Sequence, residues 1–383
     1  MMMKDVFIIA DNIISPLGGT TGENFEQLLI GNSGIRSHED ESISPTLFYA
    51  ALFEKKNYYY LQKDPLEFSR FEQLLIASIN EATTTSDVNL KDPSTLLIIS
   101  TTKGNISFLE ANNYSVEARK RATLFYSADI IQKYFRAANV PMIVSNACIS
   151  GLAALIVAHR LLLEGKYKQI VISGADVVSR FVMSGFEAFQ AISNYHCKPF
   201  DAKRNGINLG EAAATIILTT NKTKNGNLLF LSGAISNDAN HISGPSRTGK
   251  ELALAISKTL KAAHNKASDI SFVSAHGTAT LYNDEMEAKA FHSAGLCSKP
   301  VHSLKSYFGH TLGAAGLVET AVCLQSLRNQ TIIPTLGYQN NGLSVPLVIP
   351  KQVQKAPLQK IIKTASGFGG CNAAILFSTI QVN

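Results

Sequence analysis

Cys148 carries a side chain that can act as a nucleophile, and its surroundings in the sequence favour that role. It lies at a predicted strand-to-helix transition, in the stretch V-S-N-A-C-I-S-G over 144–151. A helix N-terminus carries partial positive charge and free N–H donors, which lower the pKa of a thiol from about 8.5 and make the thiolate available. The alternative interpretation is a buried core cysteine, which is the usual state of a free thiol.

Two histidines with glycine neighbours could complement this thiol. His276 lies just past a predicted strand in S-A-H-G-T-A-T, and His310 lies just before a predicted helix in K-S-Y-F-G-H. A nucleophile that holds an acyl group, together with neutral imidazole N–H donors for an oxyanion, suits enolate chemistry at a thioester. A structural role for each histidine is the alternative. No metal site is predicted, because the three residues are far apart in sequence and lack ligand spacing.

Apolar β-rich runs and helical stretches alternate along the chain and must position these residues. Short continuous apolar runs are typical of strands that are buried on both faces. Helical patterns over 151–164 and 314–327 follow the two reactive segments. The alternation predicts an α/β fold in which helices cover a mixed sheet. The predicted strands include 6–10, 95–100, 141–145, 169–173, 213–218, 270–275 and 373–377.

A weak internal repeat relates the two reactive segments. Aligning C-I-S-G-L-A-A-L at Cys148 with H-T-L-G-A-A-G-L at His310 pairs glycine with glycine and leucine with leucine. Both units place a reactive side chain at the start of a helix. We therefore predict two related halves, with residues 1–220 carrying the nucleophile and residues 221–383 carrying both histidines.

Composition and charge narrow the class of protein. The chain has 383 residues, of which 45% are hydrophobic and 17% charged, as in ordinary globular proteins. Five scattered cysteines without zinc-ligand spacing, no secretory signal and no apolar run of about 20 residues predict a cytoplasmic protein without a membrane span. The net charge of +6 indicates a mildly basic surface or an acidic macromolecular partner. Nucleic acid is not predicted, because no recognition motif accompanies the charge.

Several motifs in order along the chain carry a family resemblance. They are S-P-L-G at 15–18, the segment around Cys148, P-F-D-x-x-R-N-G at 199–206, A-H-G-T-A-T-x-x-N-D at 275–284, K-S-x-x-G-H-x-x-G-A-A-G at 305–316 and G-F-G-G-x-N at 367–372. In these motifs the chain resembles the β-ketoacyl–acyl-carrier-protein synthases of the thiolase superfamily, in their elongating Cys-His-His branch. The resemblance implies the thiolase fold, in which two related halves with mixed five-stranded sheets are layered with helices as αβαβα.

The same resemblance implies an acyltransferase that performs decarboxylative Claisen condensation. Cys148 would hold the acyl chain as a thioester, and malonyl–acyl-carrier-protein would be the second substrate. His276 and His310 would support decarboxylation and stabilise the enolate oxygen. Lys305, together with Glu319 farther along the chain, would set the electrostatic environment of the two histidines.

The remaining implied positions lie around the nucleophile. The backbone N–H groups of Cys148 and Phe368 would form the oxyanion hole, and Phe368 would act as a gate between the acylated and the malonyl-accepting states. Thr278 and Thr280 would face the phosphopantetheine arm of the carrier. Further substrate-binding and supporting positions are Gly369, Gly370 and Asp284.

Partners and pathway follow from the resemblance only in outline. No cofactor is expected, because the substrates travel on the phosphopantetheine of an acidic acyl carrier protein, which a basic surface would attract. We expect a homodimer, or a heterodimer with a related synthase or chain-length factor. Departures from the usual motifs, such as Cys371, Asn205 and Ala212, leave the pathway open between fatty-acid and polyketide-type biosynthesis, aryl polyenes and pigments included. Two alternatives are a chain-length-factor-like partner subunit, which the presence of Cys148 disfavours, and a condensing enzyme that uses coenzyme A.

Overall fold

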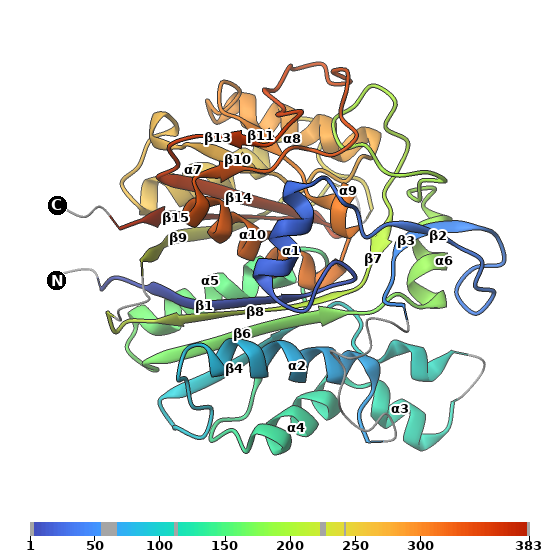
Figure 1. Cartoon of the computed structure of the whole chain (residues 1–383), viewed down its shortest axis with the longest axis vertical. Helices are drawn as coiled ribbons and strands as arrows, with labels where there is room; N and C mark the ends of the chain where they lie inside the picture. Colours follow the sequence, from blue (N-terminus) through green and yellow to red (C-terminus); the bar gives the residue numbers. More distant parts are fainter. Residues whose placement is uncertain (1–3, 55–66, 111–113, 223–226, 241–242, 381–383) are drawn as a thin grey trace.

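In the computed structural model the main strands form one mixed sheet, whose two halves face each other as two layers with helices between them (Figure 1). The structure describes residues 4–54, 67–110, 114–222, 227–240 and 243–380. Within these ranges the sheet has ten strands. Their order is β11 (Val301–His302), β10 (Phe272–Ser274), β14 (Lys360–Gly367), β15 (Cys371–Thr379), β9 (Leu228–Asn237), β1 (Phe7–Ile14), β8 (Ala212–Thr219), β6 (Gln169–Asp176), β4 (Thr95–Ser100) and β5 (Met142–Val144).

The two halves of this sheet have the same topology. From β5 inward through β4, β6 and β8 to β1, the pairings are parallel, parallel, antiparallel and antiparallel. The pairings from β11 through β10, β14 and β15 to β9 repeat this pattern. The halves meet between β1 and β9, where Phe7 pairs with Leu229 and Ile8 with Leu228. The repeat seen between the two reactive segments is therefore a repeat of whole sheets, and the α/β layered fold is confirmed.

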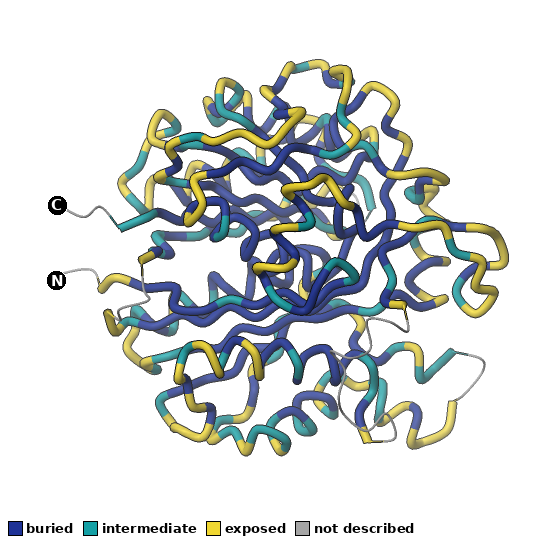
Figure 2. Tube along the Cα trace, in the orientation of Figure 1, coloured by how far each residue is buried: buried dark blue, intermediate teal, exposed yellow. Residues whose placement is uncertain are grey.

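Helices separate and cover the two halves. Two buried helices, α5 (Ser150–Leu163) and α10 (Ala315–Asn329), lie between them (Figure 1) and match the predicted helices. On the outer face of the N-terminal half lie α2 (Arg70–Thr84) and α4 (Leu124–Phe135). The C-terminal half is covered by α7 (Lys250–Ala262) and α8 (Leu281–Ser293). The central layers are almost continuously buried (Figure 2), as expected of helices that are apolar on all sides.

A glycine contact brings α5 and α10 together at their N-terminal ends. A Cβ on Gly151 would lie 2.9 Å from the backbone nitrogen of Leu317 and 3.2 Å from the carbonyl oxygen of Gly313. Only a residue without a side chain allows backbones to approach this closely. The glycines of the internal repeat therefore let the two helices meet next to Cys148 and His310.

Smaller elements complete the described chain. The first strand is longer than the predicted run 6–10, because Asp11 pairs with Arg328 at 2.6 Å and the Asn12 amide donates to the carbonyl of Gly19. No helix in the described ranges combines the length and hydropathy needed to cross a bilayer. The other elements are α1 (Thr21–Leu29), β2 (Arg36–His38), β3 (Phe48–Ala51), η2 (Ile106–Leu109), α3 (Val116–Ala122), α6 (Arg180–Ala188), β7 (Leu209–Gly210), η3 (Ala267–Asp269), α9 (Lys305–Phe308), η4 (Leu312–Ala314), β12 (Thr331–Ile332) and β13 (Gln354–Lys355).

Candidate active site

Cys148 lies on a tight turn between β5 and α5. Ala147, directly before it, has a φ of +42°, a conformation that residues with a side chain rarely adopt and that often marks a functional site. The hydroxyl of Ser150 fixes the turn: it accepts from the backbone N–H of Asn146 at 2.8 Å and donates to the carbonyl of Ala147 at 2.6 Å. The turn therefore holds the thiol in a fixed position ahead of the helix.

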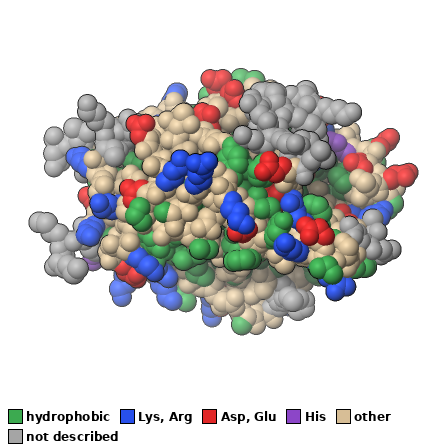
Figure 3. All heavy atoms as spheres, turned by 90° about the horizontal axis from the view of Figure 1, so that it is seen from below, with side chains coloured by type: hydrophobic (Ala, Val, Ile, Leu, Met, Phe, Trp, Pro, Cys, Tyr) green, Lys and Arg blue, Asp and Glu red, His purple; other side chains and the backbone are tan. Residues whose placement is uncertain are grey.

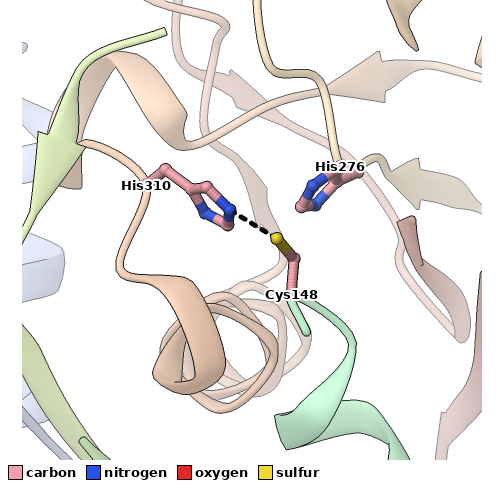
Figure 4. A group of neighbouring side chains, drawn as sticks. All are labelled: Cys148, His276 and His310. Atoms are coloured by element: carbon pink, nitrogen blue, oxygen red, sulfur yellow. Dashed lines mark hydrogen bonds between the residues drawn. The ribbon is translucent and has the colours of Figure 1, made fainter. Parts of the chain in front are cut away.

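His276 follows β10 and is held by charged groups on two sides. Its backbone N–H and that of Gly277 donate to the carboxylate of Glu287, at 2.7 Å and 2.6 Å. The ammonium of Lys305 donates to the carbonyl oxygen of His276 at 3.1 Å and lies 3.4 Å from Nδ1 of its ring. Because Nδ1 faces Lys305, the Nε2 edge of the ring is left to face Cys148 (Figure 4).

His310 completes the group from the segment that leads into the other central helix, α10. It follows α9, and its Nε2 lies 3.0 Å from Sγ of Cys148. The rings of His276 and His310 are 5.2 Å apart and nearly perpendicular, at 85°. The reactive atoms of the three residues all lie within 4.8 Å of one another (Figure 4). The structure thus brings together the three side chains that the sequence singled out.

Both histidines are neutral in this environment. Burial holds the pKa of His276 well below 6.5, and the charge of Lys305 and the proximity of His310 lower it further. Burial also holds the pKa of His310 well below 6.5, with added contributions from Lys305 and Lys363. Neutral imidazole rings can present N–H donors to a developing oxyanion without an additional buried charge.

The expected low pKa of the Cys148 thiol was wrong. Burial raises the pKa of this thiol to about 12, the neighbouring Cys371 adds to the rise, and Lys305 with the backbone N–H of Phe368 only partly offsets it. Helix α5 begins at Ser150, two residues after the sulfur, and the loss of water around the thiolate outweighs the helix terminus. The resting thiol is therefore protonated.

Alkylation of Cys148 by iodoacetamide is expected to become faster across the whole range from pH 7 to pH 10. Because the pKa is raised to about 12, the thiolate fraction increases about tenfold per pH unit without reaching a plateau. Peptide mass spectrometry would follow the rate at Cys148, with free cysteine as the reference. A plateau below pH 9 would contradict the raised pKa.

A buried charged cluster lies behind the histidines. Glu319 on α10 hydrogen-bonds to Lys305 through Oε1, and its Oε2 lies 2.7 Å from the ammonium of Lys363 on β14. Burial alone would raise the pKa of Glu319, but the two lysines lower it overall. The sequence predicted Lys305 and Glu319 but missed Lys363 and Glu287. A lysine inside the otherwise apolar run I-I-K-T-A over 361–365 was the available signal.

The trio of Cys148, His276 and His310 has the spacing to contact a single metal ion, since its ligand atoms lie within 4.8 Å of one another. The surrounding charge does not favour a resident cation. The ammonium of Lys305 lies 3.4 Å from Nδ1 of His276, and the trio contains no carboxylate. A buried ammonium next to the trio would repel a second cation. The arrangement fits donors for an oxyanion better than it fits ligands for a metal.

Two cavities meet at Cys148 and Phe368. The first has a volume of about 420 Å³ and is mainly apolar, with Phe181, Phe186 and Phe189 in its wall. The second has a volume of about 520 Å³ and a more polar wall, which includes both histidines. The Phe368 ring packs against Phe186 and Phe189 at centroid distances of 5.4 Å and 5.2 Å. One cavity therefore suits an apolar chain, and the other suits a polar arm that enters from outside.

The remaining predicted positions have different places in this arrangement. Thr278 and Thr280 line the larger cavity, with their hydroxyl oxygens 2.9 Å apart. Asp284 lies outside it and holds the preceding loop by accepting from the backbone N–H groups of Phe200 and Ala279. Gly369 and Gly370 line neither cavity and have φ of +83° and +75°. The phenylalanines of α6 were missed, because an apolar helix face gives no sign of lining a cavity.

The fold and the trio define a condensing enzyme of the thiolase type. Residues 3–224 match the family model described as the N-terminal domain of β-ketoacyl synthase, and residues 229–339 match that of its C-terminal domain. The chain belongs to the β-ketoacyl synthase family. It is an acyltransferase that joins acyl units by condensation.

Individual relatives agree with this assignment. The chain is 28% identical to 3-oxoacyl-acyl-carrier-protein synthase 2 of Vibrio harveyi, over 99% of this chain and 100% of the relative. It is 32% identical to putative polyketide β-ketoacyl synthase 1 of Streptomyces halstedii, over 66% of this chain and 63% of the relative.

Solved structures share the fold. A β-ketoacyl synthase from Burkholderia phymatum has a TM-score of 0.89 at 23% identity, over 99% of this chain and 100% of that one. A ketosynthase in complex with its chain length factor from Xenorhabdus doucetiae has a TM-score of 0.87 at 23% identity, over 98% of both chains.

Proposed function

We propose that Cys148, His276 and His310 catalyse the decarboxylative condensation of malonyl–acyl-carrier-protein with an acyl chain bound to Cys148. The observation that carries this proposal is the 3.0 Å contact between Sγ of Cys148 and Nε2 of His310, with both histidine rings neutral and buried. The site lies where an apolar and a more polar cavity meet. A chain and a carrier arm could therefore reach the sulfur from different sides.

In the first half-reaction Cys148 takes the acyl group from its carrier. Sγ attacks the thioester carbonyl, and the backbone N–H groups of Cys148 and Phe368 hold the oxyanion. The Phe368 N–H lies against the Cys148 sulfur, which supports this position. As the intermediate collapses, the C–S bond to the carrier breaks and the thiol proton moves to the departing carrier sulfur. The Nε2–H of His310 stabilises the charge that develops on Sγ.

In the second half-reaction the malonyl unit enters the larger cavity. Thr278 and Thr280 offer hydroxyl groups to the phosphopantetheine arm. The bond to the malonyl carboxylate breaks, carbon dioxide leaves, and Nε2–H groups of His276 and His310 hold the resulting enolate oxygen. The enolate carbon attacks the acyl carbonyl on Cys148, the bond from that carbon to Sγ breaks, and the thiolate that leaves takes up one proton from water to restore the thiol. The sequence of steps uses no cofactor, and none is part of our proposal.

The proposed carrier and partner subunit are supported by charge and by the sheet edge. A net charge of +6 suits an acidic carrier protein, and relatives named 3-oxoacyl-acyl-carrier-protein synthase support the same carrier.

The proposed partner subunit would bind at an edge of the sheet. Strand β5 is the outermost strand of its half, and Val140 and Met142 near this edge are exposed. The face that carries α3 and α4 shows hydrophobic side chains among charged side chains of both signs (Figure 3). A second copy or a related chain-length factor would cover this edge.

We propose that the protein works in fatty-acid or polyketide-type biosynthesis. Relatives at similar identity are named for both kinds of pathway. We also propose a reducing, cytoplasmic location, which the five free cysteines support.

Carbon dioxide release and product analysis would test the proposed reaction. Purified protein would receive an acyl–acyl-carrier-protein and malonyl–acyl-carrier-protein, and parallel samples would receive both groups on coenzyme A. We expect a product two carbons longer than the acyl substrate and one carbon dioxide per condensation, with the carrier-protein pair preferred. Acylation of Cys148 without any carbon dioxide release from either malonyl donor would refute the proposal. Equal rates with both donors would refute the carrier preference.

Replacing the proposed gate, Phe368→Ala, is expected to leave the protein folded but to uncouple its two half-reactions. The ring separates the two cavities and contacts Phe186 and Phe189. Its loss gives water access to the acyl-enzyme, so we expect hydrolysis to increase while condensation decreases. Intact-protein mass spectrometry of the acyl-enzyme over time would measure hydrolysis. The control is Phe189→Ala, which removes a ring contact but keeps the gate residue. Normal condensation and hydrolysis with only a lower melting temperature would make Phe368 a packing residue.

A further inference from the structure

Lys363 is a fully buried lysine on the strand that leads to Phe368. It lies in β14, and its relative exposure is 0%. Moving an ammonium from water into the interior of a protein is costly unless it is paired and hydrogen-bonded. A methionine of similar size would fill the same space without this cost. The position therefore requires an explanation from what the ammonium contacts.

The ammonium of Lys363 connects the end of β10 to Glu319. It donates to the carbonyl oxygen of Ala275, the residue before His276, at 3.0 Å, and to that of Thr364 at 2.5 Å. Its Nζ also lies 2.7 Å from Oε2 of Glu319. One cation thus holds both the backbone that carries His276 and the carboxylate that binds Lys305.

Lys305 occupies the opposite side of the same carboxylate. It hydrogen-bonds to Oε1 of Glu319 and reaches His276 through both the carbonyl oxygen and Nδ1. Glu319 is therefore shared between two lysines, one of which touches a catalytic ring. If Lys363 were absent, Glu319 would lose one of its two partners and could shift toward Lys305, away from the present geometry.

We propose that Lys363 is a positioning residue for His276, acting through Glu319, Lys305 and the carbonyl of Ala275. It touches no reacting atom in the proposed reaction. Its role rests on the proposed condensing activity and concerns the decarboxylation half-reaction, in which His276 holds the enolate oxygen. We expect the acylation of Cys148 to depend on it much less, because the sulfur contacts His310, which Lys363 influences only through its charge.

Several titratable groups face Lys363 from the surrounding elements. Besides Lys305 on α9 and Glu319 on α10, they are Glu287 on α8, His302 on β11, Cys323 on α10 and the two catalytic histidines. The charge of Lys363 lowers the pKa of His276, although burial and Lys305 contribute more. A proton on Nδ1 of His276 would remove the acceptor that faces Lys305. Without Lys363 this protonation occurs at higher pH, so the acidic limb of decarboxylation should move to higher pH.

The test compares Lys363→Met with Lys360→Met. Lys360 lies on the same strand but points to Asn265, away from the site, so it is a matched control. We expect Lys363→Met to accept the acyl group at normal stoichiometry, and to lower the kcat of malonyl decarboxylation about 10–100-fold with little change in KM, as outer-shell substitutions do in other enzymes. Its acidic limb should move to higher pH, and Lys363→Arg should restore part of the rate. Lys360→Met should match the wild type in each measurement.

A readout without turnover separates this inference from the proposed function. In protein labelled with ¹⁵N-histidine, the Nδ1 signal of His276 should shift in Lys363→Met because its contact with Lys305 changes, whereas that of His159 on α5 should not. If the wild type releases no carbon dioxide, the proposed function fails and the NMR shift still decides the role of Lys363. An unshifted His276 signal, or wild-type kcat and pH profile with only a lower melting temperature, would overturn the inference. If Lys363→Met does not fold, Lys363→Gln, which keeps a donor without the charge, is measured in its place.

Discussion

Cys148→Ala is expected to abolish acyl-enzyme formation. The sulfur at this position is the only one that contacts a catalytic histidine in the described structure, at 3.0 Å from Nε2 of His310. A nucleophile cannot be replaced by its neighbours, and loss of a serine nucleophile in a comparable enzyme lowers kcat by about 10⁶-fold. Intact-protein mass spectrometry after incubation with an acyl–acyl-carrier-protein should show no adduct on the variant and one on the wild type.

The neighbouring thiol provides the matched control. Sγ of Cys371 lies 3.3 Å from the carbonyl oxygen of Phe368, on the loop that also approaches Cys148. Its thiol is protonated, since burial raises its pKa to about 11. The Cys148 thiol is protonated too, so the difference lies in the contacts: Sγ of Cys371 contacts the carbonyl oxygen of Phe368, whereas Sγ of Cys148 contacts His310. We therefore expect Cys371→Ala to be acylated normally. An adduct of normal yield on Cys148→Ala, located at Cys371 by peptide mapping, would show that Cys371 is the nucleophile.

The Cys148→Ala protein should still fold and still release carbon dioxide from malonyl–acyl-carrier-protein. Cys148 is buried with a small side chain, so a methyl group at this place leaves only a small gap. His276 keeps its contacts to Lys305, and the backbone N–H of His310 keeps its hydrogen bond to the carbonyl oxygen of Asn208. Decarboxylation without acylation would show that the two half-reactions depend on different side chains.

His276→Ala and His310→Ala are expected to suppress decarboxylation by about 10²–10³-fold each, which is the usual loss when one oriented oxyanion donor is removed. Both rings are buried and neutral, and they lie 5.2 Å apart beside the sulfur. Release of labelled carbon dioxide from malonyl–acyl-carrier-protein measures this step directly. A wild-type rate in either variant would show that the substituted histidine takes no part in decarboxylation.

The two variants should differ in the other half-reaction. His310 contacts Sγ of Cys148, whereas His276 is held on its far side by Lys305. Acylation should therefore be slower in His310→Ala, while still measurable, and close to normal in His276→Ala. His159→Ala, a substitution on α5 beside Phe230, controls for loss of a half-buried histidine ring outside the site. Equal acylation rates in both catalytic variants would show that the contact with His310 does not assist the sulfur.

Local patterns in the sequence were sufficient to predict most of the fold. Strands β8 and β15, one from each half, are buried along nearly their whole length and contain continuous apolar runs, because helices cover both faces of the sheet. The first strand was predicted too short, since Asp11 and Asn12 look like a turn until their partners Arg328 and Gly19 are known. Partners at such separations cannot be seen in a sequence window.

The electrostatics of the site could not be predicted from local sequence. A cysteine before a helix suggests a lowered pKa, but burial of Cys148 raises it to about 12. Burial depends on what packs over a residue, and here both His310 and Phe368 come from distant parts of the chain. The same is true of Lys363, whose partner Glu319 lies on another element.

By itself the sequence predicted which side chains meet at the site, because the motifs around Cys148, His276 and His310 indicate both their chemistry and their place at the ends of elements. It also determined the internal repeat, since the glycines that let α5 and α10 approach are visible as aligned residues. Tertiary structure alone decided the protonation states, the two cavities and the lysine pair around Glu319. These properties depend on distances between segments and on exclusion of water, and both exist only once the two halves have packed together.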